Sequence, residues 1–369
     1  MMGCKGHRQS DTFITIDVTA SYPPKELILQ DFMDVEYIPL ETTIEFLCEG
    51  KVQAIGKDLI ILTSRMNRGD ILIFDRNGKG IRKINRMGRG GEEYTQVIAI
   101  TLDEENGELF VNNGMRTISV YDLFGKFKRS FVPREGFNYG VIYNYDNENL
   151  ICNNGTLYAG SAPTDYPSFV IVSKQDGSTI HDIYIPFKQK KLTTMPITDA
   201  DGNFRGVAML DELPIIPFHD NWILSEPSSD TVFRLSPDFS MTPFIIRSPS
   251  IQSMNPEVFL FPSILTDRYY FMRTDLKDLN HRKTKGIMYD TQEKTVFEYA
   301  VYNDDFSTKK WVGMFNTTIN SEIAFWQAIG ADILVEAYTK GQLKGKLKEI
   351  ASELEEDSNP IIMLVKYKK

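Results

Sequence analysis

The stretch Asp70–Phe131 contains the same local pattern twice. An apolar run that ends in Asp, with Gly three residues later, occurs at Asp75 and Gly78 and again at Asp122 and Gly125. The Asp ends a strand and the Gly accepts a positive φ, so each copy predicts a β-hairpin. The two glycines are 47 residues apart, a period typical of four-stranded propeller blades (about 40–50 residues) and longer than most β-solenoid repeats (about 20–30). The repeat therefore predicts a β-propeller.

The same period continues through the middle of the chain. Turns at Gly177, Phe239 and Glu293 follow at intervals of 52, 62 and 54 residues, and loop insertions between blades would produce this drift. Five sets of four strands can be placed between residues 51 and 301. Most of them are continuous apolar runs, which indicates strands covered on both faces, as in blades packed between two neighbours.

A sixth blade is predicted from both ends of the chain. Its C-terminal strands are predicted at Ile323–Ala328, Ile333–Tyr338 and Ile361–Tyr367. An N-terminal strand commonly closes such a ring so that no sheet edge stays open, and we assign this role to Glu36–Leu40. Pro39 suits an outer strand, where proline is tolerated. The predicted fold class is therefore all-β, a six-bladed β-propeller of four-stranded blades closed by an N-terminal strand.

The remaining segments complete the domain organisation. Residues 1–12 are predicted to form a tether, and residues 13–369 a single propeller domain. Apolar residues recur at helical spacing between Gly341 and Asp357, which predicts one helix inserted in the last blade, packed across one of its faces. The segment Lys188–Arg205 fits no blade strand and is expected to be irregular.

Composition excludes some classes of partner. The net charge of −9 argues against nucleic acid, because binding to a phosphate backbone needs a basic surface. No run of about 20 apolar residues is present that could span a bilayer. The three cysteines form no C-x-x-C pair or Cys/His cluster of the kind that holds structural zinc. We expect Cys48 and Cys152 to be buried free thiols, with a disulfide between them as the open alternative, and the protein to be a monomer.

The first residues, Met1-Met2-Gly3-Cys4, are informative. A small residue before a cysteine, with a polar tether after it, resembles the end of a bacterial lipoprotein signal. We therefore expect Cys4 to be acylated and the protein to lie at the bacterial cell envelope, periplasmic or surface-exposed, touching the membrane only through its lipid anchor. The alternative is an ordinary cysteine in a frayed tail.

The region around the second repeat resembles an NHL-type propeller repeat. The resemblance is carried by Gly88–Tyr94, Val97–Asp103, Gly107–Val111 and Ile118–Asp122: a Gly-rich loop, an inner strand, a Gly turn and a strand that ends in Asp. Two departures are the absence of the usual Pro before the inner strand and the presence of Asn112-Asn113 where an Asp is usual.

The whole chain from Tyr37 onward is more specifically similar to the six-bladed β-propeller lipoproteins abundant in gut anaerobes. The shared features are the Tyr37–Glu41 strand, the Gly88–Tyr94 loop and the Asn359–Tyr367 segment. The resemblance implies the fold, and it implies no particular activity because that family has no general assigned one.

No catalytic motif emerges. The Gly88–Tyr94 loop is followed by a strand, whereas a dinucleotide-binding loop would need a helix there. The chain has only four histidines and no Gly-x-Ser-x-Gly element. A metal-dependent lactonase or lyase, with a divalent metal held in the central channel by Asp, Glu, Asn or His, is the alternative to a binding protein. We otherwise expect no cofactor.

Propeller ligands normally bind at one mouth of the central channel. The loops expected there join the second strand of a blade to the third, and the fourth strand to the next blade. Arg, Asn and Tyr side chains in these loops suit a polar or anionic ligand such as a sugar or sugar acid. The candidate binding residues are Arg65, Arg68, Arg89, Glu93, Tyr94, Asn112, Asn113, Arg116, Asn153, Asn154, Glu226 and Arg273. For each of them ordinary turn chemistry or a solvated charge is the alternative. The function predicted is non-enzymatic binding of a glycan or an envelope protein, or a scaffold role.

The expected acylation of Cys4 has a direct consequence for the gene. The DNA upstream of Met1 should encode, in frame, a basic segment followed by an apolar one. Sequencing this region checks the expectation, and a stop codon immediately before Met1 would contradict it.

Overall fold

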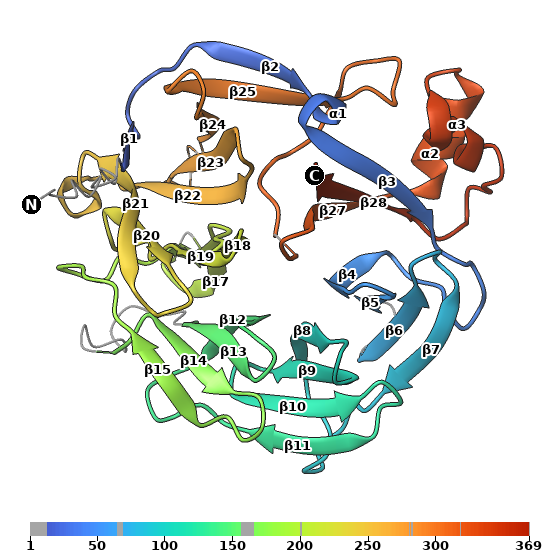
Figure 1. Ribbon diagram of the computed structural model, residues 1–369, viewed down its shortest axis with the longest axis horizontal. Coiled ribbons are helices and arrows are strands. Elements are labelled where there is room, and N and C mark those ends of the chain that lie inside the picture. The colour runs from blue at the N-terminus through green and yellow to red at the C-terminus, as the bar shows by residue number, and fades with distance from the viewer. Residues whose placement is uncertain are drawn as a thin grey trace, which may run out of the picture.

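Six sheets surround a central axis and form a closed ring (Figure 1). The computed structural model describes residues 13–64, 69–155, 166–199, 201–279, 281, 283–317 and 319–368. The predicted six-bladed β-propeller is confirmed, and the ring has a helical insertion in its last blade.

The first three blades are four-stranded antiparallel meanders that run outward from the axis. Blade one contains β4 (Lys51–Ile55), β5 (Leu59–Thr63), β6 (Asp70–Asp75) and β7 (Gly80–Asn85). Blade two contains β8 (Val97–Asp103), β9 (Glu108–Asn113), β10 (Thr117–Asp122) and β11 (Phe127–Phe131). Blade three contains β12 (Tyr139–Asn144), β13 (Asn149–Asn154), β14 (Phe169–Ser173) and β15 (Thr179–Ile183).

Blades four and five have the same meander with an additional outer strand from the N-terminus. Blade four contains β18 (Ile215–Phe218), β19 (Asn221–Leu224), β20 (Thr231–Leu235) and β21 (Met241–Ser248), and β1 (Ile14–Asp17) pairs with β21 in parallel. Blade five contains β22 (Val258–Leu265), β23 (Tyr269–Leu276), β24 (Thr284–Asp290) and β25 (Thr295–Asn303). Here β2 (Pro24–Ile28) pairs with β25 in parallel, and the short β26 (Lys310–Trp311) also pairs with β25. A 3-10 turn, η1 (Ile251–Ser253), lies between the two blades.

Blade six joins the two ends of the described chain. Its sheet has the order β27 (Ile323–Ile329), β28 (Ile361–Tyr367) and β3 (Met33–Pro39), and the one-turn helix α1 (Leu29–Phe32) precedes β3. The predicted closing role of residues 36–40 is confirmed, since β3 pairs antiparallel with β28 from Met33–Tyr367 to Pro39–Ile361. The N-terminal segment therefore runs along three blades in succession (Figure 1).

The helical insertion is larger than predicted. Helix α3 (Gly345–Ala351) lies within the predicted helical segment, but α2 (Ala331–Thr339) occupies the segment predicted as a strand at Ile333–Tyr338. That strand prediction is wrong because the apolar pattern there has a helical period, with Ala331, Leu334 and Ala337 as the buried residues. Both helices pack on blade six, as expected for the predicted helix. Among the described residues, no helix is long and apolar enough to cross a membrane.

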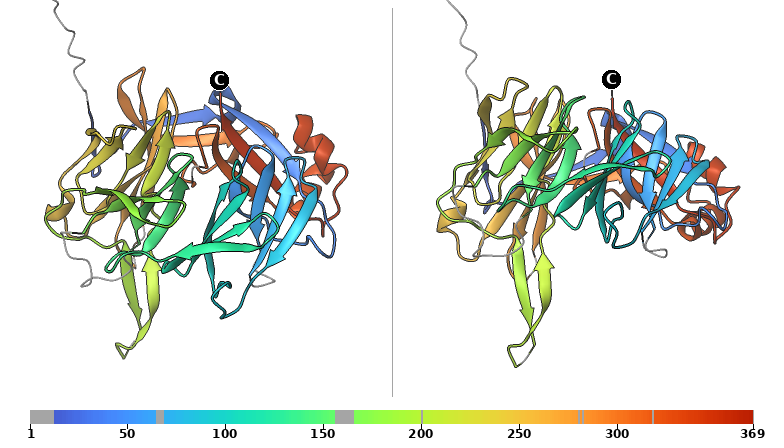
Figure 2. Two further views of the ribbon diagram at one scale, coloured as in Figure 1. Left: turned by 60° about the horizontal axis from the view of Figure 1, so that its bottom comes forward. Right: turned by 90° about the horizontal axis from the view of Figure 1, so that it is seen from below.

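The segment predicted as irregular between Lys188 and Arg205 contains most of a hairpin. Strands β16 (Thr194–Thr198) and β17 (Phe204–Met209) pair with each other and with no blade. The Asp199 carboxylate accepts hydrogen bonds from the backbone N–H groups of Asp201 and Asn203, at 3.0 and 2.8 Å, and Gly202 has φ +82°. This is the same Asp-x-x-Gly turn that marks the blades. The hairpin projects from the body of the propeller (Figure 2).

Alternate residues of the inner strands pack into different cores, which explains their continuous apolar sequence. In β5, Ile60 and Leu62 pack toward blade six, whereas Ile61 packs toward blade two. In β28, Met363 belongs to the core shared with blade five, while Leu364 packs toward blade one. Each blade therefore seals both faces of its sheet against its neighbours. Burial of this apolar surface is the main stabilising term of the ring.

The repeated turn also helps to close the ring. The Asp75 carboxylate accepts from the backbone N–H groups of Asn77 and Lys79 at 2.8 and 2.9 Å. Gly78 has φ +84°, and a Cβ at this position would lie 1.9 Å from the backbone oxygen of Pro39 in the closing strand. Glycine is therefore required at this turn both for its backbone conformation and for the close approach of β3.

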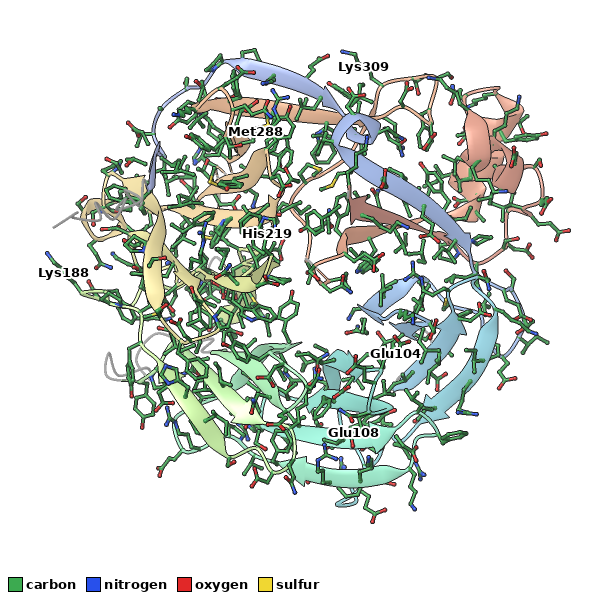
Figure 3. The ribbon with its side chains drawn as sticks, in the orientation of Figure 1. Glu104, Glu108, Lys188, His219, Met288 and Lys309 are labelled. Atoms are coloured by element: carbon green, nitrogen blue, oxygen red, sulfur yellow. The ribbon has the colours of Figure 1, made fainter. Side chains whose placement is uncertain are left out.

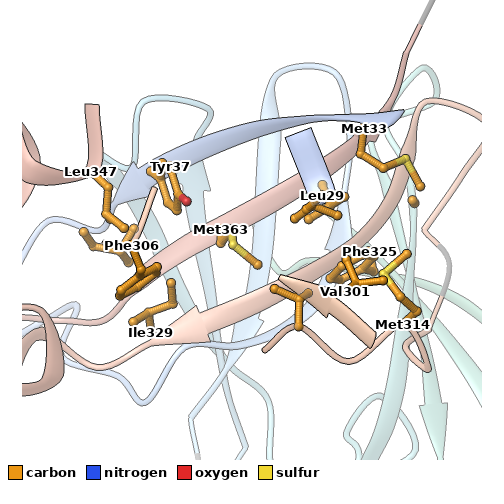
Figure 4. Packing of buried hydrophobic residues seen from close by; sticks show 14 of the residues in the cluster. Leu29, Met33, Tyr37, Val301, Phe306, Met314, Phe325, Ile329, Leu347 and Met363 are labelled. Atoms are coloured by element: carbon orange, nitrogen blue, oxygen red, sulfur yellow. The ribbon is translucent and has the colours of Figure 1, made fainter. Parts of the chain in front are cut away.

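A buried hydrogen-bond network connects the closing strand to blade five. The Tyr37 hydroxyl donates to the Asp305 carboxylate and accepts from the Asn303 amide, each at 2.8 Å. The Gln30 amide donates to the same two residues, at 2.9 Å to Asp305 and 2.6 Å to Asn303. Burial raises the pKa of Tyr37 well above its usual range. The Tyr37 ring packs in the same core as Phe306, Leu347 and Met363 (Figure 4).

Two thiols behave as predicted. Cys48 and Cys152 are buried free cysteines, and burial raises the pKa of both. Thiols with raised pKa values are poor nucleophiles, so these two residues serve packing.

Removing one hydroxyl from the network should weaken ring closure. Tyr37→Phe removes the oxygen acceptor of the buried Asn303 amide and leaves it only the weaker Met363 sulfur at 3.4 Å, and it is expected to destabilise the fold by about 1–3 kcal/mol. Thermal or denaturant unfolding measures the loss. Tyr184→Phe is the matched control, because Tyr184 is 51% exposed and its stability effect should be small. Equal effects of the two substitutions would contradict the assigned role of Tyr37.

Candidate functional site

A cavity of about 1230 Å³ occupies the centre of the ring. Its wall includes the innermost strands β4, β8 and β12 and parts of β18. Phe315, Asn316 and Trp326 extend the wall on the side of blades five and six. The cavity is therefore the central channel of the propeller, where the sequence predicted a ligand.

Four of the predicted residues lie at one end of this channel. Asn153 and Arg273 line the cavity, and Asn153, Asn154 and Glu226 line a small pocket that adjoins it. They lie in, or directly after, the second strands of blades three, four and five. We refer to the residues around this junction as the polar mouth: Asn153, Asn154, Lys190, Lys191, Thr193, Glu212, Glu226 and Arg273.

Three other predicted residues are engaged in holding the fold. The buried Tyr94 hydroxyl donates to the Gly69 carbonyl at 2.5 Å. The Asn112 amide donates to the carbonyls of Tyr139 and Gly140, both at 2.9 Å, which ties blade two to blade three. The Asn113 side chain accepts from the backbone of Thr95 and Gln96. The loop Gly88–Tyr94 thus connects two blades and does not reach the cavity lining.

The remaining predicted residues lie elsewhere. Arg89, Glu93 and Arg116 are exposed and do not line the cavity, and the Glu93 carboxylate accepts from the backbone of Gly90 at 2.7 Å. Arg65, Arg68 and the lipidation candidate Cys4 lie outside the described residues. The structure therefore brings together Asn153, Asn154, Glu226 and Arg273, and not the arginines of the first two blades.

Ion pairs hold the cations of the polar mouth in place. Lys190 contacts both oxygens of the buried Glu226 carboxylate, at 2.8 and 2.9 Å. Lys191 lies 3.2 Å from Glu257. These pairs fix the segment that leads from blade three into the β16–β17 hairpin.

Arg273 is held from three sides. Its guanidinium lies 2.6 Å from the Asp275 carboxylate and donates to the backbone oxygen of Asp211 at 2.7 Å. The guanidinium carbon lies 3.5 Å from the centroid of the Phe315 ring. A cation stacked on a ring and paired with a carboxylate has little freedom, so Arg273 presents a rigid surface to the cavity.

Glu212 lines both the cavity and the adjoining pocket, and sequence reasoning missed it. It follows the β16–β17 hairpin, and the only sequence signal for this position was the long insertion before blade four. Burial raises the pKa of Glu212 to about 7, with a further increase from the nearby Glu226 and an opposing effect from Lys190. Near neutral pH this carboxyl therefore exists in both protonation states.

Aromatic side chains line several parts of the cavity wall. Tyr143, Tyr145 and Trp222 form a cluster, with ring centroids 5.8 Å apart for Tyr143–Trp222 and 6.1 Å apart for Tyr145–Trp222. Trp326 and Phe315 line other parts of the wall. The cavity thus combines flat apolar surfaces with polar side chains, several of which belong to the polar mouth.

The projecting hairpin extends the wall beyond the polar mouth. Thr194 and Met209, which are paired at its base, line the cavity, and Met195 and Ala208 pack on Phe259 and Phe261 of blade five. Its base is therefore fixed to the propeller while its outer part stands free (Figure 2).

The opposite end of the channel carries different groups. His219 lies on the inner side of the ring, whereas Lys309 lies at the rim (Figure 3). His219 lines the cavity and its Nε2 lies 3.2 Å from the exposed Asp267 carboxylate. No group of three or more His, Cys, Asp or Glu side chains in the described part of the chain is arranged to hold a metal ion.

The raised pKa of Glu212 predicts a pH-dependent stability effect. An ordinary carboxyl of an unfolded chain ionises near pH 4.3, whereas Glu212 stays protonated in the folded protein to about pH 7. Between these values the folded state binds the extra proton, so stability falls as pH rises. Glu212→Gln removes this loss and is expected to stabilise the protein by about 1–3 kcal/mol at pH 8, with almost no effect at pH 4.5.

Thermal unfolding at the two pH values measures this difference. Glu353→Gln, a substitution of an exposed carboxylate, is the control and should have little effect at either pH. A Glu212→Gln effect that is the same at both pH values would contradict a neutral Glu212 in the folded protein.

Solved structures share the fold at low sequence identity. A "Putative exported protein" from Bacteroides fragilis aligns with a TM-score of 0.64 and 14% identity, over 97% of this chain and 100% of that one. Virginiamycin B lyase from Staphylococcus aureus aligns with a TM-score of 0.34 and 12% identity, over 68% of this chain and 88% of that one. BamB from Moraxella catarrhalis aligns with a TM-score of 0.34 and 9% identity, over 86% and 85%. The first alignment shows a shared fold and nothing about function. The other two alignments are too weak to support a conclusion about fold or function.

Sequence comparison places the chain in a family. No curated protein sequence matches it significantly. The family described as "Domain of unknown function (DUF4934)" matches residues 13–366, which span the described propeller. The chain therefore belongs to the DUF4934 family.

Proposed function

We propose that this protein is a binding module of the bacterial cell envelope that takes a short glycan into its central channel through the polar mouth. The observation that carries this proposal is a large central cavity whose wall combines aromatic side chains with polar ones, among them those of the polar mouth. Sites for small ligands are typically concave and largely apolar, with a few fixed polar groups that orient the ligand.

The size of the cavity favours a ligand of several rings. Its volume of about 1230 Å³ exceeds the usual range for small-molecule pockets, about 300–1,000 Å³. A single metabolite would leave most of it empty, whereas an oligosaccharide could contact the aromatic wall and the polar mouth together. The hairpin base at Thr194 and Met209 prolongs the wall for a longer chain.

The chemistry of the wall suits sugars. Sugar rings have apolar faces and polar edges, and Trp222, Tyr143 and Trp326 offer flat apolar surfaces for such faces. At the mouth, Asn153 and Arg273 offer donors for hydroxyl groups. Arg273 and Lys190 are already fixed by ion pairs, so binding needs little further ordering of these side chains.

The envelope location is part of the same proposal. It rests on the lipoprotein-like Met1–Cys4 sequence, with Cys4 as the acylated residue, and agrees with the exported character named for the Bacteroides fragilis structure. The partner is then a glycan, free or attached to an envelope polymer, and the module acts as a monomer. No observation on the described residues favours the metal-dependent lactonase or lyase, so binding is the function proposed.

Intrinsic fluorescence offers a direct test. The chain has three tryptophans; Trp222 and Trp326 line the cavity, whereas Trp311 is 60% exposed on β26. After a glycan array has identified binders, titration of the strongest one should change the tryptophan emission. Trp222→Ala is expected to weaken binding by about tenfold or more, because it removes an aromatic face of the wall.

Trp311→Ala provides the matched control and should leave the affinity unchanged. Thermal unfolding of all variants shows whether each remains folded at the assay temperature. Absence of binding to any arrayed glycan, or equal losses in Trp222→Ala and Trp311→Ala, would contradict glycan binding in the channel.

A further inference from the structure

The polar mouth carries three cations and two carboxylates. The cations are Lys190, Lys191 and Arg273, the carboxylates are Glu212 and Glu226, and three further carboxylates, Asp211, Glu257 and Asp275, lie beside it. Each of these cations is already paired: Lys190 with Glu226, Lys191 with Glu257, and Arg273 with Asp275. Within the described chain, neither Glu212 nor Asp211 forms an ion pair, and Lys190, which pairs with Glu226, acts on Glu212 only from a greater distance.

Glu212 differs from Asp211 in its surroundings. Asp211 is exposed, so water can solvate its charge, whereas Glu212 is partly buried at the junction of the cavity and the adjoining pocket. A carboxylate withdrawn from water is costly unless a cation or several hydrogen-bond donors approach it. The place where such a group would sit is the cavity itself.

We propose that the ligand bound in this cavity carries an amine, held as an ammonium ion against Glu212, so that the glycan is an amino sugar or carries an aminoalkyl substituent. This inference rests on the proposed glycan-binding function and specifies its ligand class. It differs from the expectation based on sequence, in which several arginines favoured an anionic ligand. Arg89 and Arg116 do not line the cavity, and Arg273 is already paired with Asp275.

The electrostatic surroundings of Glu212 support an amine. The negative charge of Glu226 outweighs the positive charge of Lys190 at this site, which contributes to the raised pKa of Glu212. A potential that disfavours a carboxylate favours a cation at the same place. Binding of an ammonium ion would shift Glu212 to its ionised form and release its proton to solvent.

Lys51, His219 and Asp220 also line the cavity, on elements away from the segment that carries Glu212. Lys51 lines the cavity from β4 in blade one, across the ring from blade four (Figure 1). It makes no ion pair with the described residues and would favour an anion on that side. His219 and Asp220 line the cavity from the β18–β19 turn, at the opposite end. Lys51 is therefore the group that a competing anionic ligand would use.

Three matched probes separate the charge of the ligand from its sugar ring. They are 2-aminoethyl glucoside, 2-hydroxyethyl glucoside and carboxymethyl glucoside, which carry a positive, neutral and negative substituent. Calorimetric titration at about pH 8, with probe concentrations up to about 50 mM, compares their affinities. The amino probe is expected to bind about tenfold more tightly than the hydroxyl probe, as for a hydrogen bond between charged partners.

The dependence on Glu212 is tested in two ways. Glu212→Gln keeps the shape of the side chain and should abolish the preference for the amino probe, while Glu353→Gln, a substitution of an exposed carboxylate outside the cavity, should leave it unchanged. In the unmodified protein the preference should shrink between about pH 8 and about pH 6, because Glu212 regains its proton near pH 7. Thermal unfolding confirms that both variants are folded.

The outcomes distinguish this inference from the proposed function. Equal affinities for the amino and hydroxyl probes, tighter binding of the carboxymethyl probe, or no binding of any probe would overturn the assignment of an amine. A neutral or acidic glycan bound on the array with loss in Trp222→Ala would then leave glycan binding in place. A preference for the amino probe that survives in Glu212→Gln would also overturn the role of Glu212.

Discussion

The pairing of β3 with β28 is the interaction on which the rest of the structure depends. These strands come from opposite ends of the described chain, and their pairing removes the open sheet edge that a linear row of blades would leave. The two strands before β3 add β1 to blade four and β2 to blade five, so the N-terminal segment binds three consecutive blades. The inner strands can enclose a cavity only while this ring is closed.

The sequence predicted the fold well because the propeller is specified by local patterns. Asp75-x-x-Gly78 and its copy at Asp122 mark blade turns whose hydrogen bonds are made within four residues, as the contacts to Asn77 and Lys79 show. The errors arose where a short apolar segment was ambiguous. Ile333–Tyr338 has a helical period that a brief apolar run can hide. The Asp199-x-x-Gly202 turn lies in a hairpin that belongs to no blade, so the blade period does not predict it.

The candidate site was less predictable than the fold. Which side chains meet at the central channel depends on how the whole ring closes, and no single segment of the sequence shows this. Asn112 and Asn153 both lie in second strands. The Asn112 amide donates to the carbonyls of Tyr139 and Gly140, whereas Asn153 lines the cavity. No sequence motif marks Glu212. Its raised pKa arises from burial and from Glu226, which lies 14 residues further along the chain. Spacing along the chain could not show which cations would already be paired.

Binding in the channel can be tested most directly by the crystal structure of the protein in complex with the glycan that it binds most tightly. The proposal predicts sugar rings inside the central cavity, in contact with Trp222 and with at least one side chain of the polar mouth. A complex in which the glycan lies on the outer rim, while the cavity holds only water, would contradict it.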